Sequence, residues 1–505
     1  MFSQNMNFNK LGRLASKFFF GSALGLVVFM TGCGGGGGGA TASGPTGTLT
    51  AITVTPGNAS IGIGSTVTLK ALGSYSNGGT GDITAQVTWT PSSSVINVKA
   101  GGVVTGVSVG AATITASLSG ITSAAVNVAV TLVGGSAAAN HLNYARYEQT
   151  ANLILAGTSG EAVLVAGGWG PDSAGNTVAL NSAELYDPTT NTWTITSSLA
   201  TVRGDHTSTQ LANGQVLLIG GADTSLKLIA NSELYIPNTG WVAADSLLEG
   251  RSYHTSTLLL DGTTVLAVGG GGNASPNLAS SELYDSIHDK GGNKGTWKAT
   301  GSLNEGRNTH TATLLTNGTN ATNGKVLVVG GFGGVVNAGP GVVASVGKPL
   351  ASAELYDPNH GTWTTTGSLH TGRYEHTATL LTNGKILVIG GFDSNDTALG
   401  TAELYDPLIG TWTVIGNLNT ARAGHTATLL GTGKVLVMGG ETSRGVETKS
   451  TELFDPATGI SIATADLNAK RDAFTATLLT NGKVLVAAGT DETSAVVALD
   501  SSELY

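Results

Sequence analysis

Residues 373–412 read RYEHTATLLTNGKILVIGGFDSNDTALGTAELYDPLIGTW. The stretch contains four short apolar runs, and turn residues such as Asn383-Gly384 and Asp406-Pro407 separate them. Runs of this length between turn signals are typical of β-strands joined by tight turns. The stretch therefore predicts one four-stranded antiparallel sheet.

The same order of segments recurs from residue 146 to residue 505, at an average spacing of about 54 residues. Each copy has an arginine, a leucine four residues before it and a Glu-Leu pair in its third run. Paired glycines end the second run in six copies, tryptophan opens the fourth run in five, and histidine follows the arginine by three residues in five. The arginines are Arg146, Arg203, Arg251, Arg307, Arg373, Arg422 and Arg471; the glutamates are Glu184, Glu233, Glu282, Glu354, Glu403, Glu452 and Glu503; the histidines are His206, His254, His310, His376 and His425.

Glycine pairs after the second run, an aromatic residue on the third and tryptophan on the fourth resemble the kelch family. The resemblance implies a β-propeller in which each copy forms one blade. We therefore expect an all-β chain in which residues 132–505 form a seven-bladed kelch-type β-propeller.

The end of the repeat region predicts how the ring closes. The sequence stops at Leu504-Tyr505, before a seventh copy would supply its outer strand. Residues 136–145 align without gaps to residues 363–372, which places Leu142 on Leu369. We therefore expect residues around 134–142 to complete the last blade.

The repeated charged residues favour a structural role, because one active site does not need seven copies of an arginine or a glutamate. We expect each arginine to pair with a glutamate within or between blades; catalysis or carboxylate binding is the alternative. One histidine per blade favours structural hydrogen bonds over a shared metal site. Residues 393–396 are oxygen-rich but lack the rest of an EF-hand loop, so they make a poor calcium site. We expect no metal site.

Catalytic motifs do not stand out in the sequence. Some kelch propellers are copper oxidases with a cysteine-linked tyrosine radical, but the only cysteine here, Cys33, lies near the N-terminus. Neither a nucleophile elbow nor a zincin motif nor a phosphate-binding loop is present. The sequence therefore predicts a non-enzymatic protein without a cofactor.

Residues 47–131 are rich in Val, Thr and Ser and alternate between polar and apolar positions, as in ITV at 52–54. Such alternation predicts short strands with one buried face. The segment resembles the bacterial Ig-like domain (group 2) in VTP at 54–56, in Trp89 with the serines that follow, and in GVVTG at 102–106. The resemblance implies an N-terminal Ig-like β-sandwich that serves as a spacer or adhesive module.

Residues 1–33 predict a lipoprotein signal segment. Three basic residues precede a mostly apolar run of about 13 residues, which is short for a membrane span and typical of a secretory signal. The segment ends in MTGC, which resembles a bacterial lipobox with Met30 in place of the usual leucine. The resemblance implies lipid on Cys33; an ordinary signal peptide with an incidental cysteine is the alternative.

Glycine-rich residues 34–46 predict a flexible tether after the signal. Because Gly34 and not aspartate follows Cys33, the resemblance implies the outer membrane or cell surface of a bacterial envelope. Loss of the three basic residues on cleavage would change the formal net charge from −9 to −12. An acidic chain without basic clusters is a poor nucleic-acid binder, so we expect no nucleic-acid partner.

The residues that differ between copies carry the remaining functional information. The loop between the second and third strands opens at the same end of a blade as the connection into the first strand, because the strands alternate in direction. Function usually resides in such loops on a rigid scaffold. The candidate ligand-binding residues at this end are Tyr147, Glu148, Trp169, Asp205, Tyr253, Asn308, Tyr374, Glu375 and Asp472. Aromatic side chains beside acids and amides suit a glycan or a peptide, and merely solvated loops are the alternative.

These patterns favour a surface-anchored, non-enzymatic binding or adhesion protein that recognises a protein or glycan. A carbohydrate-active hydrolase or lyase on the same face is one alternative, and a purely structural envelope protein is another. Two close carboxylates with a histidine or arginine at the channel mouth would favour the enzyme. A flat apolar or aromatic rim would favour binding.

Overall fold

The computed structural model describes residues 47–62, 66–107, 110–131, 137–156, 160–273, 275–287, 294–316, 322–334, 347–491 and 497–505. All regular secondary structure in these ranges is β-strand, which confirms the expected all-β class. None of the described residues belongs to a helix that could cross a membrane. The expected signal segment, with Cys33, and the expected tether at 34–46 lie outside these ranges.

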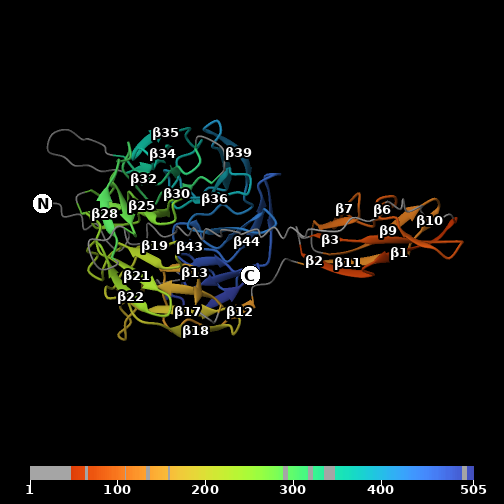
Figure 1. Cartoon of the computed structure of the whole chain (residues 1–505), viewed down its shortest axis with the longest axis horizontal. Coiled ribbons are helices and arrows are strands. Elements are labelled where there is room, and N and C mark those ends of the chain that lie inside the picture. Colours follow the sequence, from red (N-terminus) through yellow and green to blue (C-terminus); the bar gives the residue numbers. More distant parts are fainter. Residues whose placement is uncertain are drawn as a thin grey trace, which may run out of the picture. The chain divides into compact units, whose positions relative to one another are not determined.

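The chain divides into two compact units, whose described parts are residues 47–131 and 137–505 (Figure 1). The strands of the smaller unit are β1 (Leu49–Thr55), β2 (Asn58–Gly62), β3 (Thr66–Thr68), β4 (Lys70–Tyr75), β5 (Thr80–Asp82), β6 (Thr88–Pro91), β7 (Ile96–Lys99), β8 (Val103–Gly106), β9 (Gly110–Leu118), β10 (Ile121–Thr122) and β11 (Val126–Thr131). They form one sheet in the order β1-β4-β5, a second in the order β10-β9-β11-β2 with β6 also on β9, and a third in the order β3-β8-β7. Along β11, Val126, Val128 and Val130 are buried and alternate with exposed residues, as expected for a strand with one buried face.

The larger unit contains seven four-stranded antiparallel sheets. In chain order their strands are β13 (Thr150–Ala156), β14 (Gly160–Ala166), β17 (Ala183–Asp187) and β18 (Thr192–Ile195); β19 (Thr207–Gln210), β20 (Val216–Ile219), β21 (Ser232–Ile236) and β22 (Gly240–Ala244); β24 (Thr255–Leu258), β25 (Thr264–Val268), β27 (Ser281–Asp285) and β28 (Thr296–Ala299); β30 (Thr311–Leu314), β31 (Val326–Val329), β34 (Ala353–Asp357) and β35 (Thr362–Thr365); β36 (Thr377–Leu380), β37 (Ile386–Ile389), β38 (Thr401–Asp406) and β39 (Thr411–Asn417); β40 (Thr426–Leu429), β41 (Val435–Met438), β44 (Thr451–Asp455) and β45 (Ile460–Ala463); and β46 (Thr475–Leu478), β47 (Val484–Ala487), β50 (Ser502–Leu504) and β12 (Ala137–Ala139). The stretch 373–412 supplies the first three strands of the fifth sheet and the start of its outer strand, so the predicted four-stranded unit is confirmed.

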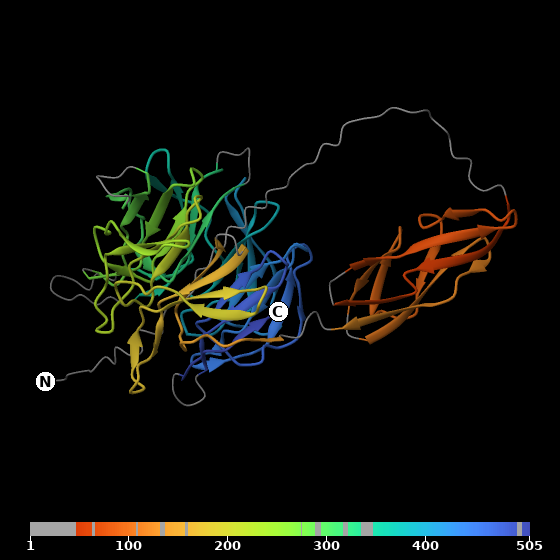
Figure 2. The ribbon, with the colours of Figure 1, turned by 60° about the horizontal axis from the view of Figure 1, so that its bottom comes forward.

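The core of this unit lies between neighbouring sheets. Second strands such as β31 and β37 are buried along their whole length, which explains their uninterrupted Val, Ile and Leu runs. Their side chains join Tyr405 and Trp412 in one cluster that spans the fourth and fifth sheets. The first strand of each sheet contacts that of the next, and β46 of the seventh sheet contacts β13 of the first. Figure 2 shows the sheets following one another around the unit.

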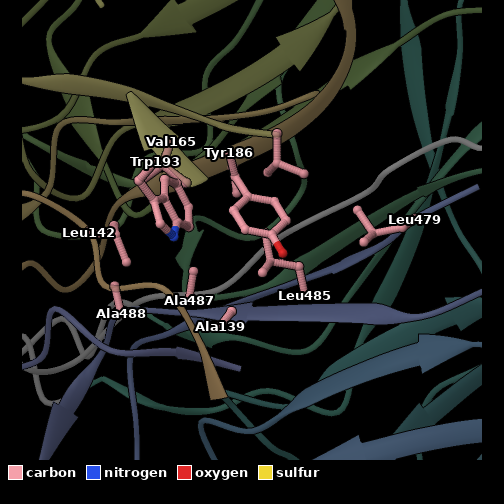
Figure 3. Close-up of a cluster of buried hydrophobic side chains, with 11 residues drawn as sticks. Ala139, Leu142, Val165, Tyr186, Trp193, Leu479, Leu485, Ala487 and Ala488 are labelled. Carbon is pink, nitrogen blue, oxygen red and sulfur yellow. The ribbon is translucent and has the colours of Figure 1, made fainter. Parts of the chain in front are cut away.

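The seventh sheet takes its outer strand from the N-terminal side of the unit. β12 pairs with β50, with Ala137 opposite Leu504 and Ala139 opposite Ser502. The expected closing segment is therefore confirmed for residues 137–139. Behind it lies a cluster of apolar side chains from the first and seventh sheets (Figure 3). Because β12 runs antiparallel to β50, the chain enters this unit at the end where third strands lead into fourth strands.

Short extra ladders form in the loops between the second and third strands, and in two copies they also include the connection into the first strand. They comprise β15 (Trp169–Pro171) and β16 (Thr177–Ala179); β23 (Arg251–Ser252) and β26 (Gly271–Gly272); β29 (Arg307–Asn308), β32 (Phe332–Gly333) and β33 (Lys348–Pro349); β42 (Glu441–Ser443) and β43 (Val446–Glu447); and β48 (Thr490–Asp491) and β49 (Val497–Ala498). In all seven copies the residue after the arginine pairs with the residue after the end of the second run, as in Tyr374 with Phe392. The connection into the first strand and the loop after the second strand therefore share one end of each sheet, as the sequence predicts.

The paired glycines allow this end to form. Gly390 has a φ of +65°. A Cβ on it would lie 2.4 Å from the carbonyl oxygen of Arg422 and 2.6 Å from the His425 ring in the next sheet. Only glycine combines this backbone conformation with so close an approach.

Candidate binding site

The seven arginines and seven glutamates form buried ion pairs within their own sheets. Each arginine side chain is fully buried, and its Nη2 lies 2.6–3.0 Å from a glutamate Oε1 in six copies; Arg471 and Glu503 also pair. Nη1 donates to the carbonyl oxygen at the end of the second run, for example from Arg373 to Gly390 at 2.9 Å. The predicted structural pairing is confirmed: these charged side chains bind each other inside the sheets.

The five histidines are also structural. Each Nε2 lies 2.8–3.1 Å from a threonine hydroxyl on the first strand of the preceding sheet, such as His376 with Thr311. Burial lowers the pKa of His376 to about 3, so its ring is neutral near pH 7. Asp393 Oδ1 accepts hydrogen bonds from the backbone of Asn395 and Thr397, so it closes a turn. Within the described ranges no group of three histidine, cysteine or acidic residues could hold a metal ion.

The residue two positions after each arginine has a left-handed backbone in all seven copies. These residues are Glu148, Asp205, Tyr253, Thr309, Glu375, Gly424 and Ala473, with φ between +49° and +64°. Four of them donate a backbone hydrogen bond to the carbonyl oxygen of the corresponding residue in the preceding sheet, as Thr309 does to Tyr253 at 3.2 Å. The seven positions therefore form one belt from sheet to sheet, which we call the loop-end belt.

A first acidic group lies where the first three sheets meet at the belt. Burial raises the pKa of Asp205 to about 6, and polar contacts with Glu148, Tyr253 and Trp169 limit that rise. Burial and the charge of Asp205 raise the pKa of Tyr253 well above its ordinary value, so this tyrosine remains a neutral phenol. The Trp169 ring packs on Gly204, where a Cβ would lie 2.1 Å from the indole nitrogen. Acidic and aromatic side chains from three sheets therefore meet here.

A second group surrounds Arg444 at the turn between β42 and β43. Its Nη2 lies 2.5 Å from the Tyr374 hydroxyl, and its Nη1 lies 3.4 Å from Glu375 Oε1. The guanidinium also stacks on Phe392, at 4.5 Å from the ring centre. The Tyr374 hydroxyl also bonds to Asp396. Arg444 therefore holds the sixth sheet's loop against the fifth sheet.

A pair of carboxyl groups lies beside Arg444. Burial raises the pKa of Glu441 to about 9, and the charges of Asp472 and Glu375 add to the rise. Glu441 is hydrogen-bonded to Asp472, which belongs to the seventh sheet's connection, and its Oε2 accepts a hydrogen bond from the Gly445 backbone at 3.1 Å. A protonated acid thus sits beside a second acid between two sheets.

The nine candidate residues all lie on the connections or the ladders at the loop end, but their exposure differs. Tyr147, Tyr253, Asn308 and Asp472 are half-buried. The other five are buried: Glu148, Trp169, Asp205, Tyr374 and Glu375 are 1–7% exposed. Sequence reasoning missed Arg444 and Glu441, which contact these residues from the β42–β43 hairpin, and it considered Asp396 only as part of a poor calcium site. The glutamate in place of an apolar residue after the sixth glycine pair is the signal that could have found Glu441.

Comparisons with known proteins agree with these repeats. The family model described as Kelch motif matches residues 154–200, 317–370 and 373–419. The model of the bacterial Ig-like domain (group 2) matches residues 48–130. The chain contains kelch motifs and a bacterial Ig-like domain.

Two further similarities are partial or distant. Ice-binding protein 1 of Shewanella frigidimarina is 43% identical over 72 residues, which are 14% of this chain and 8% of that protein's length. A fungal alcohol oxidase of the AA5 family, solved in complex with copper, superposes with a TM-score of 0.52 and 18% identity over 74% of this chain and 76% of that one. At that identity the similarity shows the fold alone. The residues here do not fit a copper centre, because the chain's only cysteine is Cys33 and the five repeat histidines each bond to a threonine hydroxyl of the neighbouring sheet.

Proposed function

We propose that the seven sheets are the blades of a seven-bladed kelch-type β-propeller, and that the protein is a non-enzymatic, surface-anchored binding or adhesion protein. Three observations support the propeller: the cycle of contacts between first strands, the outer strand that β12 lends to the seventh sheet, and the similarity to the fungal oxidase over most of the unit. In this arrangement the loop-end belt surrounds one mouth of the central channel.

One observation carries the binding function. The arginines and glutamates that recur in every copy pair inside the sheets, whereas charged residues of individual copies such as Asp205, Glu441 and Arg444 lie at the loop end. A rigid scaffold with individual loops at one end is the usual form of a recognition surface. The described part of this unit begins at the opposite end, with Ala137 on β12.

The half-buried residues are the contacts that this function requires. Tyr147 and Tyr253 supply aromatic surface, and Asn308 and Asp472 supply amide and carboxylate groups. Such a mixture of side chains can bind both sugar hydroxyls and peptide groups, because each phenol or amide both donates and accepts hydrogen bonds. The ligand class is accordingly a protein or glycan of the cell's surroundings.

The carboxyl pair favours a second candidate, a hydrolase or lyase. A neutral acid beside an ionised one is the arrangement that acid–base cleavage of a glycosidic bond uses. Glu441 is only 7% exposed, however, and it lies within the loops between two sheets. A catalytic acid must reach the substrate, so this arrangement argues for binding over catalysis. A purely structural envelope protein would need none of these individual loop residues.

A binding assay with the full chain tests the recognition face. Tyr253→Ala is expected to weaken capture of envelope glycans or proteins by about tenfold or more, because aromatic anchors carry much of an interface's energy. The measurement is a glycan-array and pull-down comparison with the unsubstituted chain. Tyr75→Ala, a half-buried tyrosine of the smaller unit, is the matched control. If the protein captured nothing but cleaved a polysaccharide, the binding function would be wrong.

The anchor is a separate proposal, that lipid on Cys33 holds the protein to a bacterial outer membrane or cell surface. The basic and apolar N-terminal segment, the MTGC sequence and the glycine-rich residues 34–46 support it. Growth of the host on labelled palmitate is expected to label the protein, and Cys33→Ser is expected to abolish the label. If the wild-type protein carried no label, the proposed lipid anchor would be wrong.

A further inference from the structure

The position after the second-strand glycines is filled differently at one boundary between sheets. Phe332 packs edge-on against Tyr374 of the next sheet, with 5.4 Å between ring centres. Phe392 packs in the same apolar cluster as Ala423 of the next sheet. At the boundary between the sixth and seventh sheets, this position is Glu441 and its partner is Asp472. A pair of acids thus stands where the two preceding boundaries have apolar contacts.

The surroundings of Glu441 are strongly acidic. Glu375 approaches from the connection into β36, Asp472 from the connection into β46, and Glu447 lies opposite on β43. Asp491 lies on β48, next to Thr490, which pairs with Asp472. The nearby cation is Arg444, which contacts Glu375 at 3.4 Å. Ionisation of Glu441 therefore adds a negative charge to a group that one guanidinium already balances only in part.

The same hairpin covers an apolar cluster. Tyr374, Phe392, Ala398 and Ala423 form a buried group at the loop end, with Phe332 against it. Arg444 lies over the Tyr374 and Phe392 rings, at 5.2 and 4.5 Å from their centres. Tyr374 is 1% exposed beneath it. Release of the β42–β43 hairpin would therefore expose aromatic surface at the end where the proposed ligand binds.

We propose that the β42–β43 hairpin is a proton-controlled cover, closed over the Tyr374–Phe392 cluster while Glu441 and Asp472 share a proton and released when that proton is lost. A protonated Glu441 can donate a hydrogen bond to Asp472, whereas two carboxylates at this contact repel each other. The repulsion acts on the base of the hairpin, because Glu441 begins β42. The cover would regulate the proposed recognition face, so its biological role rests on the proposed function.

The direction of the pH dependence follows from linkage. In a released hairpin Glu441 is exposed to water and regains an ordinary pKa near 4.5, whereas in the closed hairpin burial raises its pKa to about 9. The closed form therefore binds the proton more tightly. Closure is fully favoured below pH 4.5 and weakens as the pH rises from there towards 9.

Hydrogen exchange measured by mass spectrometry at pH 5.5–8 tests the cover without any ligand. In the full wild-type chain, the protection of backbone amides in residues 439–449, corrected for intrinsic exchange rates, is expected to fall with pH by up to about tenfold per unit. In Glu441→Gln the fall is expected to shrink to less than about threefold over the range. Asp472→Asn is expected to flatten the profile as well, because it removes the other acid of the pair. The β30–β31 hairpin of the fourth sheet is the internal control, since its two strands contain no acidic side chain.

A wild-type profile that does not change with pH would contradict the proposed cover, and so would an equal fall in Glu441→Gln or in the β30–β31 hairpin. Protection of the β30–β31 hairpin at pH 5.5 also reports whether each variant is folded. Because the experiment uses no ligand, its failure leaves the recognition face to be judged by the binding assay alone.

Discussion

Glu403→Gln is expected to lower the free energy of unfolding by about 3–5 kcal/mol, the usual cost of removing one partner from a buried ion pair. Arg373 is fully buried and lies 2.7 Å from Glu403 Oε1. It also donates to the carbonyl oxygens of Gly390 and Thr401, so it cannot turn outwards without breaking the end of the sheet. The substitution therefore leaves a positive charge buried without its counter-ion. Glu403 further accepts a hydrogen bond from the His370 backbone at 2.9 Å, which a neutral amide oxygen supports less strongly.

Chemical denaturation of the larger unit, followed by circular dichroism, measures this loss. Asp466→Asn is the matched control, because Asp466 and Lys449 form an ion pair at 3.8 Å with both side chains about half exposed. An exposed pair of this kind contributes about 0–1 kcal/mol. Equal effects of the two substitutions would contradict the buried role of Glu403 and show that solvent reaches the pair.

The scaffold could be predicted from the sequence because residues that recur in every copy indicate structural roles, whereas residues found in one copy indicate specific functions. Arg373 and Glu403 looked like catalytic residues in one copy, but seven copies indicated pairs, and the structure confirms them. The closing strand was also predictable, since Leu142 occupies the same position as Leu369 and both are buried. In each case one local pattern determines the contact.

The arrangement of the loop end could not be read in this way. Contacts such as Arg444 with Tyr374 join loops of different copies, about 70 residues apart, and no repeated spacing encodes them. Burial of Tyr374 depends on which neighbouring hairpin folds over it. The acidity of Glu441 likewise depends on Asp472 and Glu375, which come from two other sheets. Sequence reasoning placed the variable loops and the connections at one end of the sheets, but it did not predict which side chains that end leaves exposed.

Loss of the closing strand is expected to have the other large effect. In a fragment that starts at residue 143, β50 loses β12, and the cluster shared by the first and seventh sheets is opened to water (Figure 3). That cluster contains Leu142 and the Trp193 ring, whose indole donates to Ser502 at 3.1 Å. The fragment is therefore expected to melt well below a fragment that starts at residue 132, because the ring of sheets is no longer fastened.

A point substitution separates packing from chain truncation. Leu142→Ala in the full chain is expected to cost about 2–5 kcal/mol, as is typical of a buried leucine that leaves a cavity. Leu155→Ala is the control, because Leu155 is 75% exposed on β13 and its loss opens no cavity. Calorimetry of both variants and both fragments makes the comparison. If the fragment from residue 143 melted at the same temperature as the longer one, or if Leu142→Ala cost no more than Leu155→Ala, β12 would be a peripheral strand. Unequal costs in the expected order would show that the segment entering the larger unit also holds its first and last sheets together.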